Sequence, residues 1–127
     1  MQSPTNRRYS ESHEWFLIEG DTVTVGITHH AVDELTDITY VEMQPPGAEI
    51  ATGGSLGEVE SVKTTAEVFS TVAGTVTEVN EAVATDPAIL NSDPYDAGWL
   101  VKLNVTDTSN LENLMDAAAY DQLLGSA

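Results

Sequence analysis

Lys63 is the residue whose setting most clearly favours chemistry. It follows a short alternating apolar stretch over 57–62 and precedes another over 66–69, and this pattern predicts two strands joined by a turn at the lysine. A lysine at an exposed β-turn offers an accessible amine on a rigid support. Acylation would remove its charge and convert it into a long neutral tether.

Both lysines of the chain, Lys63 and Lys102, also have explanations that involve no chemistry. Lys63 would be an ordinary turn residue if its ammonium paired with Glu60 or Glu67. Lys102 lies on the outer face of a predicted strand over 99–105, where alternation places Trp99, Val101, Leu103 and Val105 together on the other face. Lys102 therefore needs no functional explanation, whereas Lys63 leaves two interpretations open.

The three histidines, His13, His29 and His30, raise the question of a metal site. Adjacent histidines diverge on a helix, and no pair has the i, i+4 spacing that places two imidazoles on one helix face. We therefore expect no metal site. No Ser-His-Asp order or carboxylate pair stands out as catalytic either.

The charge balance excludes several classes of partner. The 127 residues include 21 acidic and only four basic side chains, for a formal net charge of −17. Nucleic acids and anionic membranes attract basic surfaces, so we expect neither as a partner. No apolar run approaches the ~18 residues of a membrane span, and polar residues follow Arg7-Arg8 where an export signal would be apolar. These features favour a cytoplasmic protein.

Cysteine is absent, so the polypeptide itself offers no disulfide, thiolate ligand or cysteine nucleophile. Any sulfur redox chemistry would have to come from an attached cofactor.

The pattern up to about residue 105 predicts a mainly β domain. A helix is expected over 28–35, with Thr28 as its cap, and the whole chain, 1–127, forms one domain with a flexible N-terminus over 1–8. The expected strands cover 15–18, 22–27, 38–43, 57–62, 66–69, 74–80 and 99–105.

From residue 107 onward the pattern becomes helical. Ser109 and Glu112 fit a capping box, and Asp116 can begin a second helix that carries Tyr120 and ends before Gly125. We expect the segment 107–127 to form a helical cover on the β core.

Six short motifs occur in order between residues 9 and 124, and together they are specific. The motifs are Ser12-His13-Glu14-Trp15, Val25-Gly26-Ile27-Thr28, Glu60-Ser61-Val62-Lys63, Val79-Asn80-Glu81, Asn91-Ser92-Asp93-Pro94-Tyr95 and Gly98-Trp99. They resemble those of the glycine cleavage system H-protein family, whose members carry lipoate. The resemblance implies a barrel-sandwich hybrid of the lipoyl/biotinyl-carrier type, with lipoate in amide linkage to Lys63.

The residues beside Lys63 distinguish this family from other carriers. Biotin carriers typically have methionine on both sides of the lysine, and lipoyl domains of 2-oxoacid dehydrogenases usually have Asp-Lys-Ala, whereas this chain has Val62 and Thr64. The chain departs from the H-protein pattern at Thr36, where glycine is usual, at Met43-Gln44 and at Thr71. These departures affect local turns and leave the lysine motif intact.

The resemblance also implies partners. The lipoyl arm would shuttle the aminomethyl group of glycine between a pyridoxal-phosphate-dependent glycine decarboxylase, a tetrahydrofolate-dependent aminomethyltransferase and dihydrolipoamide dehydrogenase, after lipoate-attaching enzymes have modified the lysine. The carrier itself would not be an enzyme. Glu60, Ser61 and Val62 belong to the attachment motif, and Ser12, Glu14 and Glu67 match family positions around a cleft that would shelter the loaded arm.

Two alternatives remain open at this stage. Lys63 could pass octanoyl or lipoyl groups to other lipoyl domains as a relay, or the chain could be an unmodified acidic interaction domain. The resemblance does not account for the net charge of −17. We interpret it as an adaptation to a high-salt cytosol, as in a halophile, where salt screens carboxylate repulsion.

Overall fold

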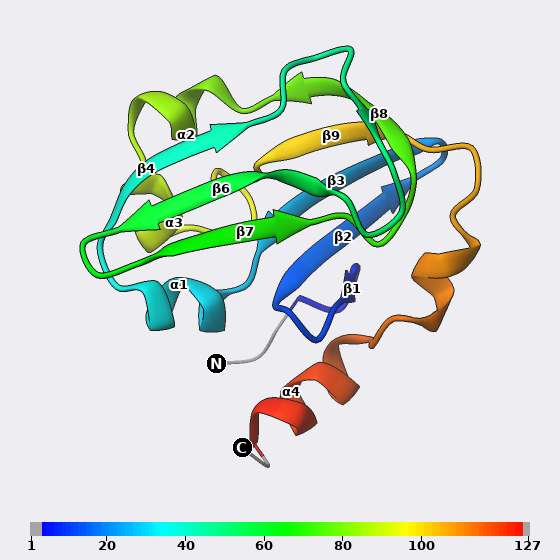
Figure 1. The fold of residues 1–127 in the computed structure, drawn as a ribbon. Helices are drawn as coiled ribbons and strands as arrows, with labels where there is room; N and C mark the ends of the chain where they lie inside the picture. The colour runs from blue at the N-terminus through cyan, green and yellow to red at the C-terminus, as the bar shows by residue number, and fades with distance from the viewer. Residues whose placement is uncertain (1–3, 126–127) are drawn as a thin grey trace.

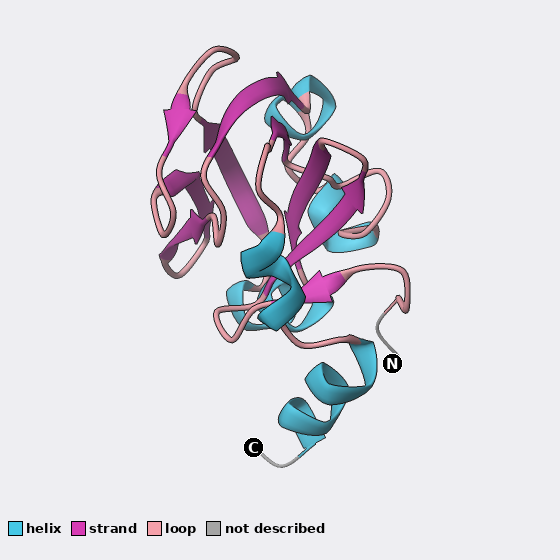
Figure 2. Cartoon of the chain, turned by 90° about the vertical axis from the view of Figure 1, so that its right-hand side faces the viewer, coloured by secondary structure: helices cyan, strands magenta, loops and turns pink. Residues whose placement is uncertain are grey.

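The computed structural model describes residues 4–125 and contains two antiparallel sheets that face each other (Figures 1 and 2). The mainly β prediction is therefore confirmed. The larger sheet has the strand order β1 (Arg8–Tyr9), β2 (Glu14–Glu19), β3 (Thr22–Ile27), β9 (Val101–Asn104), β8 (Gly74–Val79) and β5 (Glu49–Ile50), and the smaller sheet has the order β4 (Ile38–Met43), β6 (Ser55–Ser61) and β7 (Thr65–Phe69).

Alternation along the strands builds the main core between the two sheets. In β7, Val68 is buried while its neighbours Glu67 and Phe69 are exposed, because successive side chains point to opposite faces. Val25 of β3 and Val59 of β6 belong to the same apolar cluster as Val68, so both sheets contribute to one core.

The predicted alternation is wrong at Trp99. Regular pairing in β9 begins only at Val101, and Trp99 packs instead against a second apolar cluster near the chain ends. Leu100, which the same alternation would place on the outer face with Lys102, is buried in the main core. The strand pattern therefore holds only where the backbone pairs regularly.

The second cluster joins the two ends of the described chain. Tyr9 of β1 and Tyr120 of α4 (Ala117–Gly125) are fully buried, and their rings stack with centroids 4.8 Å apart. Trp15 of β2 completes this cluster, so α4 covers the edge of the larger sheet below the body of the fold (Figure 1). Residues 126–127 of the expected helical cover lie outside the described residues.

The N-terminal segment is held more firmly than the expected flexibility of residues 1–8 suggested. Residues 1–3 lie outside the described residues, but Arg7 is buried and Arg8 pairs in β1. The Arg7 guanidinium lies 4.5 Å from the centroid of the Trp15 ring and donates a 2.9 Å hydrogen bond to the Tyr95 carbonyl. Burial of a cation against aromatic faces fixes this part of the chain.

The helical segments differ from prediction mainly at the C-terminus. The expected Ser109–Glu112 capping box is absent, because Ser109–Asn113 forms a 3-10 helix and the Ser109 amide bonds the Asp107 carboxylate at 3.0 Å. Asp116 does cap α4 by accepting from the Ala119 amide at 2.8 Å, and α4 includes Gly125. Two further helices were not predicted, α2 (Glu81–Thr85) and α3 (Ile89–Ser92).

Helix α1 (His29–Leu35) begins as predicted and ends under strain. The Thr28 hydroxyl accepts a 3.3 Å hydrogen bond from the Ala31 amide. At the other end Thr36 has φ 67°, a conformation that is costly for a β-branched residue. This strain is the physical reason why glycine would fit the position better. Within residues 4–125, no helix is long and apolar enough to cross a membrane.

Candidate functional site

Lys63 lies at the tip of the hairpin that joins β6 to β7, as predicted. The two strands pair in a constant register from Glu60 opposite Thr65 to Gly57 opposite Val68, so the tip is the point at which the smaller sheet turns back (Figure 1). The Val62 amide also donates a 3.1 Å hydrogen bond to the Asp37 carbonyl, which ties the tip to the start of β4. The lysine therefore projects from an anchored support.

The turn at the tip is organised by Ser61. Its hydroxyl oxygen accepts from the amides of Lys63 and Thr64, at 3.3 and 3.2 Å. The Ser61 amide bonds the Thr64 carbonyl at 2.8 Å, which closes the turn. A serine that satisfies two turn amides holds the backbone of the lysine while leaving its side chain outside. Beside it, Val62 is 66% exposed, which is unusual for an apolar side chain of this fold.

The two lysines have different surroundings. Within residues 4–125 no ion pair involves Lys63, so the alternative in which its ammonium pairs with Glu60 or Glu67 is not observed. Lys102, by contrast, lies half-buried on β9 with its ammonium 5.0 Å from the centroid of the Trp99 ring. The amine of Lys63 is the one that is exposed and uncommitted.

Ser12 and Glu14 lie together in a dense hydrogen-bonded cluster. One carboxylate oxygen of Glu14 accepts from the hydroxyls of Ser10 and Ser12, at 2.5 and 2.6 Å. The other accepts from the Phe69 amide at 3.1 Å, which links β2 of one sheet to β7 of the other. Glu14 is only 2% exposed, and these three donors stabilise its buried charge.

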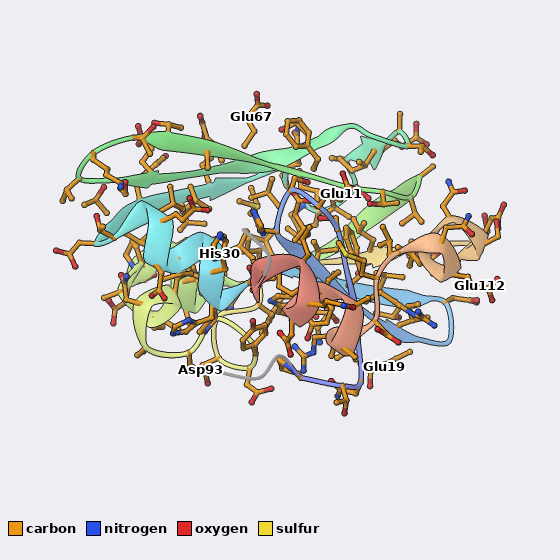
Figure 3. All side chains as sticks on the ribbon, turned by 90° about the horizontal axis from the view of Figure 1, so that it is seen from below. Glu11, Glu19, His30, Glu67, Asp93 and Glu112 are labelled. Carbon is orange, nitrogen blue, oxygen red and sulfur yellow. The ribbon has the colours of Figure 1, made fainter. Side chains whose placement is uncertain are left out.

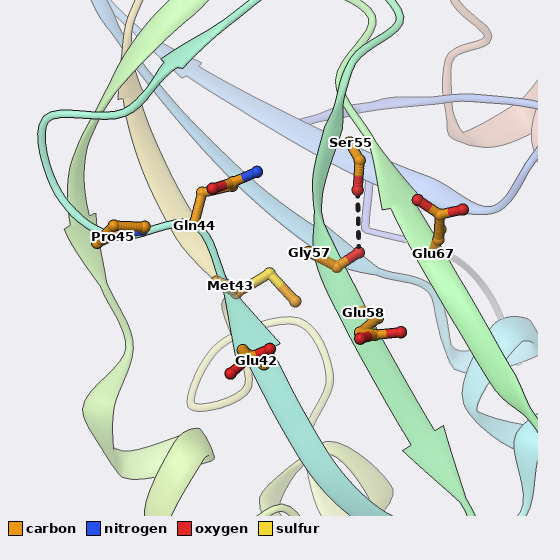
Figure 4. A pocket seen from close by; sticks show the side chains of 8 residues that line it. All are labelled: Glu42, Met43, Gln44, Pro45, Ser55, Gly57, Glu58 and Glu67. Carbon is orange, nitrogen blue, oxygen red and sulfur yellow. Dashed lines mark hydrogen bonds between the residues drawn. The ribbon is translucent and has the colours of Figure 1, made fainter.

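Glu67 lies apart from that cluster, on the outer face of β7. It lines a groove of about 400 Å³ with Glu58 and Glu42 of the two neighbouring strands (Figure 4). Figure 3 shows its side chain pointing outward from the smaller sheet. Glu67 follows Lys63 by four residues, so at ~3.3 Å per residue at most about 13 Å of chain separates them. Within the described residues, no hydrogen bond or ion pair connects Glu67 to Ser12 or Glu14.

A group of two histidines and a glutamate lies next to the cluster around Glu14, and helix spacing did not predict it. His13 and His30 have ring centroids 4.5 Å apart, and Glu34 contacts His30 with 2.8 Å between carboxylate oxygen and Nε2. Burial, and then the neighbouring His30, lower the pKa of His13. Helix spacing cannot reveal this approach, because His13 comes from the turn before β2 and His30 from α1.

Comparisons with known proteins decide the family. The family model for "Glycine cleavage H-protein" matches residues 7–127. A glycine cleavage system H protein of Staphylococcus saprophyticus is 44% identical over 125 residues, covering 98% of this chain and 99% of its own. One from Thermus thermophilus is 44% identical over 126 residues, covering 99% and 98%. The crystal structure of a glycine cleavage system H protein from Mycobacterium marinum superposes with a TM-score of 0.88 at 38% identity, covering 97% of this chain and 99% of that one.

The chain belongs to the glycine cleavage H-protein family. The function predicted from the motifs is confirmed at this level, because the family is the lipoyl carrier of the glycine cleavage system. The barrel-sandwich hybrid is confirmed as well, since the two facing antiparallel sheets are shared with the H protein of known structure.

The sequence motifs identified two members of the cluster around Glu14 and missed two. Ser12 and Glu14 were identified, whereas Ser10 and the Phe69 amide were not. Ser10 lies four residues before Glu14, across a turn that the hydrogen bond from the Ser10 amide to the Glu14 carbonyl closes at 3.0 Å. The Phe69 amide carries no sequence signal, because every residue except proline has a backbone N–H.

Proposed function

We propose that Lys63 is the residue of this H protein that carries lipoate, in amide linkage to its Nζ. The observation that supports the proposal best is the unpaired, exposed side chain at an anchored hairpin tip, in a chain whose only other lysine packs on Trp99. The surroundings fit the group, because an amide-linked arm requires an accessible amine and space beyond it. When bound, lipoate supplies the dithiolane sulfurs that this cysteine-free chain lacks.

The residues before Lys63 would present it to the modifying enzyme. Ser61 fixes the turn through the Lys63 and Thr64 amides, and Val62 offers an exposed apolar surface beside the amine. Glu60 accepts from the Thr65 hydroxyl at 3.5 Å across the first pair of the hairpin. We infer that these three residues position and expose the amine, and that a lipoate-attaching enzyme recognises this hairpin tip.

Ser12, Glu14 and Glu67 would shelter and orient the loaded arm. Glu14 is buried with donors on both oxygens, so we assign it a positioning part, which holds the Ser12 hydroxyl and the end of β7 in place. Ser12 and Glu67 are exposed and can contact a ligand. A cationic amine on the arm would be held by carboxylates near it, and limited access of water would slow its hydrolysis.

The carrier would act without catalytic residues of its own. Its partners, by this proposal, are a pyridoxal-phosphate-dependent glycine decarboxylase, a tetrahydrofolate-dependent aminomethyltransferase, dihydrolipoamide dehydrogenase and a lipoate-attaching enzyme. The chain contributes the position of the amine, the sheet that supports it and the shelter beside β7. The chemistry on the carried group belongs to the partner enzymes.

Mass spectrometry of the protein from cells with functional lipoylation tests the attachment site. We expect the intact mass to include one lipoyl group, located on the peptide that contains Lys63. Lys63→Arg should abolish the modification because a guanidinium keeps the charge but offers no acylatable amine. Lys102→Arg is the matched control and should be modified like wild type.

A fully unmodified Lys63 in such cells would overturn the proposal and favour an unmodified acidic interaction domain. The relay alternative needs a separate measurement, namely the lipoylation of other lipoyl domains in a strain that lacks this chain. Retained lipoylation there would exclude an essential relay role.

The part played by Ser61 can be tested with a matched pair of serines on β6. Ser61→Ala removes the hydroxyl that bonds the turn amides, whereas Ser55→Ala removes one that bonds the Gly57 carbonyl of its own strand, at 3.4 Å. We expect Ser61→Ala to slow enzymatic lipoylation in vitro by several-fold and Ser55→Ala to leave its rate unchanged. Equal rates for both variants would show that the turn needs no serine.

A further inference from the structure

Two histidines and a carboxylate from separate parts of the chain converge next to α1. His13 comes from the turn before β2, while His30 and Glu34 lie one helical turn apart on α1. Each offers a ligand atom, and these atoms all lie within 4.8 Å of one another. Figure 3 shows His30 on the flank of α1 that faces α4 and the turn containing Glu11.

His13 is held in place by its backbone and by its second ring nitrogen. It is one of two non-glycine residues among 4–125 with a positive φ, at 72°, and such conformations persist where the surroundings enforce them. Its Nδ1 lies 2.7 Å from the Tyr120 hydroxyl, which in turn lies 2.7 Å from the Thr28 hydroxyl. With a proton on Nδ1 donated to Tyr120, the lone pair of Nε2 is free to ligate a metal. This is the arrangement that orients most metal-binding histidines in proteins.

The other two groups are already in contact. The Nε2 atom of His30 lies 2.8 Å from a carboxylate oxygen of Glu34, at i, i+4 on α1. A metal ion inserted between them would gain two ligands from one face of the helix. The neighbouring pair His29 and Asp33 has the same spacing and a similar 3.2 Å contact, but it belongs to no cluster of three possible ligands within the described residues.

Two of the three groups, His13 and His30, open onto a hollow with room for an additional ligand. A pocket of about 410 Å³ is lined by Glu11, His13 and His30 together with Leu123 and Leu124 of α4. Three protein ligands leave one coordination position of a tetrahedral ion for water, and the hollow provides the space for it.

We propose that His13, His30 and Glu34 form a binding site for a divalent transition-metal ion of the zinc type. Two imidazoles and one carboxylate are a ligand set that suits Zn²⁺ and its neighbours Co²⁺ and Ni²⁺. The bound ion would cross-link the turn before β2 to α1, directly beside Ser12 and Glu14. The site does not depend on Lys63, so its test is independent of the lipoyl proposal.

Calorimetric titration of the full chain with Zn²⁺, after purification with a chelator, tests the site. The buffer contains about 1 M potassium chloride, where a Debye length of ~3 Å screens diffuse binding to surface carboxylates. One Zn²⁺ per chain is expected. His30→Gln and Glu34→Gln should each weaken binding at least ~10-fold, since each removes a ligand. Both residues lie on the surface side of α1, so the fold should tolerate these changes.

The matched controls are His29→Gln and Asp33→Asn, which alter the parallel pair on the same helix. Both should bind Zn²⁺ like wild type, and Zn²⁺ should raise the Tm of wild type and of His29→Gln but not of His30→Gln. Tyr120→Phe keeps the stacked ring and removes the partner of Nδ1, so affinity should fall about 10-fold with the fold intact. Absence of saturable binding, or equal loss in the His29 and His30 variants, would overturn the proposal.

Discussion

Glu14 and the glutamates of the smaller sheet show two opposite uses of a carboxylate in one acidic chain. Glu14 is buried and accepts hydrogen bonds from two hydroxyls and one backbone amide. Glu42, Glu58 and Glu67 are exposed on the groove of the outer face, and they occupy directly opposed positions on β4, β6 and β7. The first carboxylate binds the two sheets together, whereas the other three repel one another.

The register makes this repulsion a property of the fold. Glu58 is paired with Glu42 on one side and with Glu67 on the other. Directly opposed residues have Cβ atoms about 4.5–5.5 Å apart, and like charges at that distance are destabilising. The same side chain type is therefore stabilising where donors surround it and destabilising where only other acids do. Net charge alone, at −17, conceals this difference.

The largest expected effect comes from removing the buried carboxylate. Glu14→Ala leaves the Phe69 amide without its acceptor, in the region where β2 meets β7. The Ser10 hydroxyl loses its 2.5 Å bond to the carboxylate and keeps the longer contact of 3.4 Å to the backbone carbonyl of residue 14. Hydrogen bonds to a charged group contribute about 1.5–3 kcal/mol each, and buried donors left unpaired add to the loss. We expect the free energy of unfolding, measured by urea denaturation, to fall by about 3–4 kcal/mol.

Glu67→Ala is the control for that measurement. Its carboxylate is exposed and faces another acid, so its removal should change stability by less than about 0.5 kcal/mol, or increase it slightly. If the two variants lost equal stability, the contrast between the buried and the exposed carboxylates would fail.

Local patterns predicted the elements that position the site. Alternation gave the bounds of Thr22–Ile27 and Ile38–Met43 as they occur in the structure, and it placed Lys63 in a β-turn. The two-residue strands Arg8–Tyr9 and Glu49–Ile50 were missed because two residues cannot show a period. Sequence patterns report strands only where enough residues alternate.

Contacts between segments that are distant in the chain could not be predicted from the sequence. The stack of Tyr9 on Tyr120, and the approach of His13 to His30, bring together residues from separate elements. The position of Trp99 was predicted wrongly for the same reason, because Trp99 packs against a cluster that forms from both ends of the chain. Motif resemblance identified Glu14, but its burial and its hydrogen bond to β7 depend on the tertiary structure.

Salt should act on the exposed carboxylates and barely on Glu14. Between 0.1 and 1 M ionic strength the Debye length falls from about 10 to about 3 Å, so repulsion on the surface is screened. We expect the Tm of wild type to rise by roughly 6–10 °C over a potassium chloride series that extends to molar salt, equivalent to about 2 kcal/mol. A midpoint that stays flat from low to molar salt would contradict the high-salt interpretation of the net charge.

Reversing the central charge of the outer face should stabilise the protein at low salt. Glu58→Lys turns two repulsive cross-strand pairs into attractive ones, each contributing about 0.2–1 kcal/mol. The expected gain is about 1 kcal/mol in dilute buffer, and it should largely disappear at molar salt. Thermal unfolding at both salt concentrations measures it.

Glu19→Lys gives the same change in net charge away from the opposed glutamates. Glu19 is exposed at the end of β2 and lies opposite Thr22, on the other side of the molecule from Glu67 (Figure 3). Its gain at low salt should be smaller than that of Glu58→Lys. Equal gains would mean that total charge, and not the opposed register, governs the salt effect.

The smallest expected change in stability comes from relieving backbone strain at Thr36, a change that involves no charge. Thr36 ends α1 with φ 67°, a conformation that costs a non-glycine residue about 1–3 kcal/mol, and its hydroxyl bonds only the preceding Leu35 carbonyl. Thr36→Gly relieves the strain but adds about 0.5–1 kcal/mol of unfolded-state entropy, so a net gain of about 0.5 kcal/mol is expected. Because no charge changes, the gain should be the same in dilute buffer and in molar potassium chloride. A gain that varied with salt would show that the salt response arises from more than the carboxylates, and it would weaken the contrast between Glu14 and the outer face.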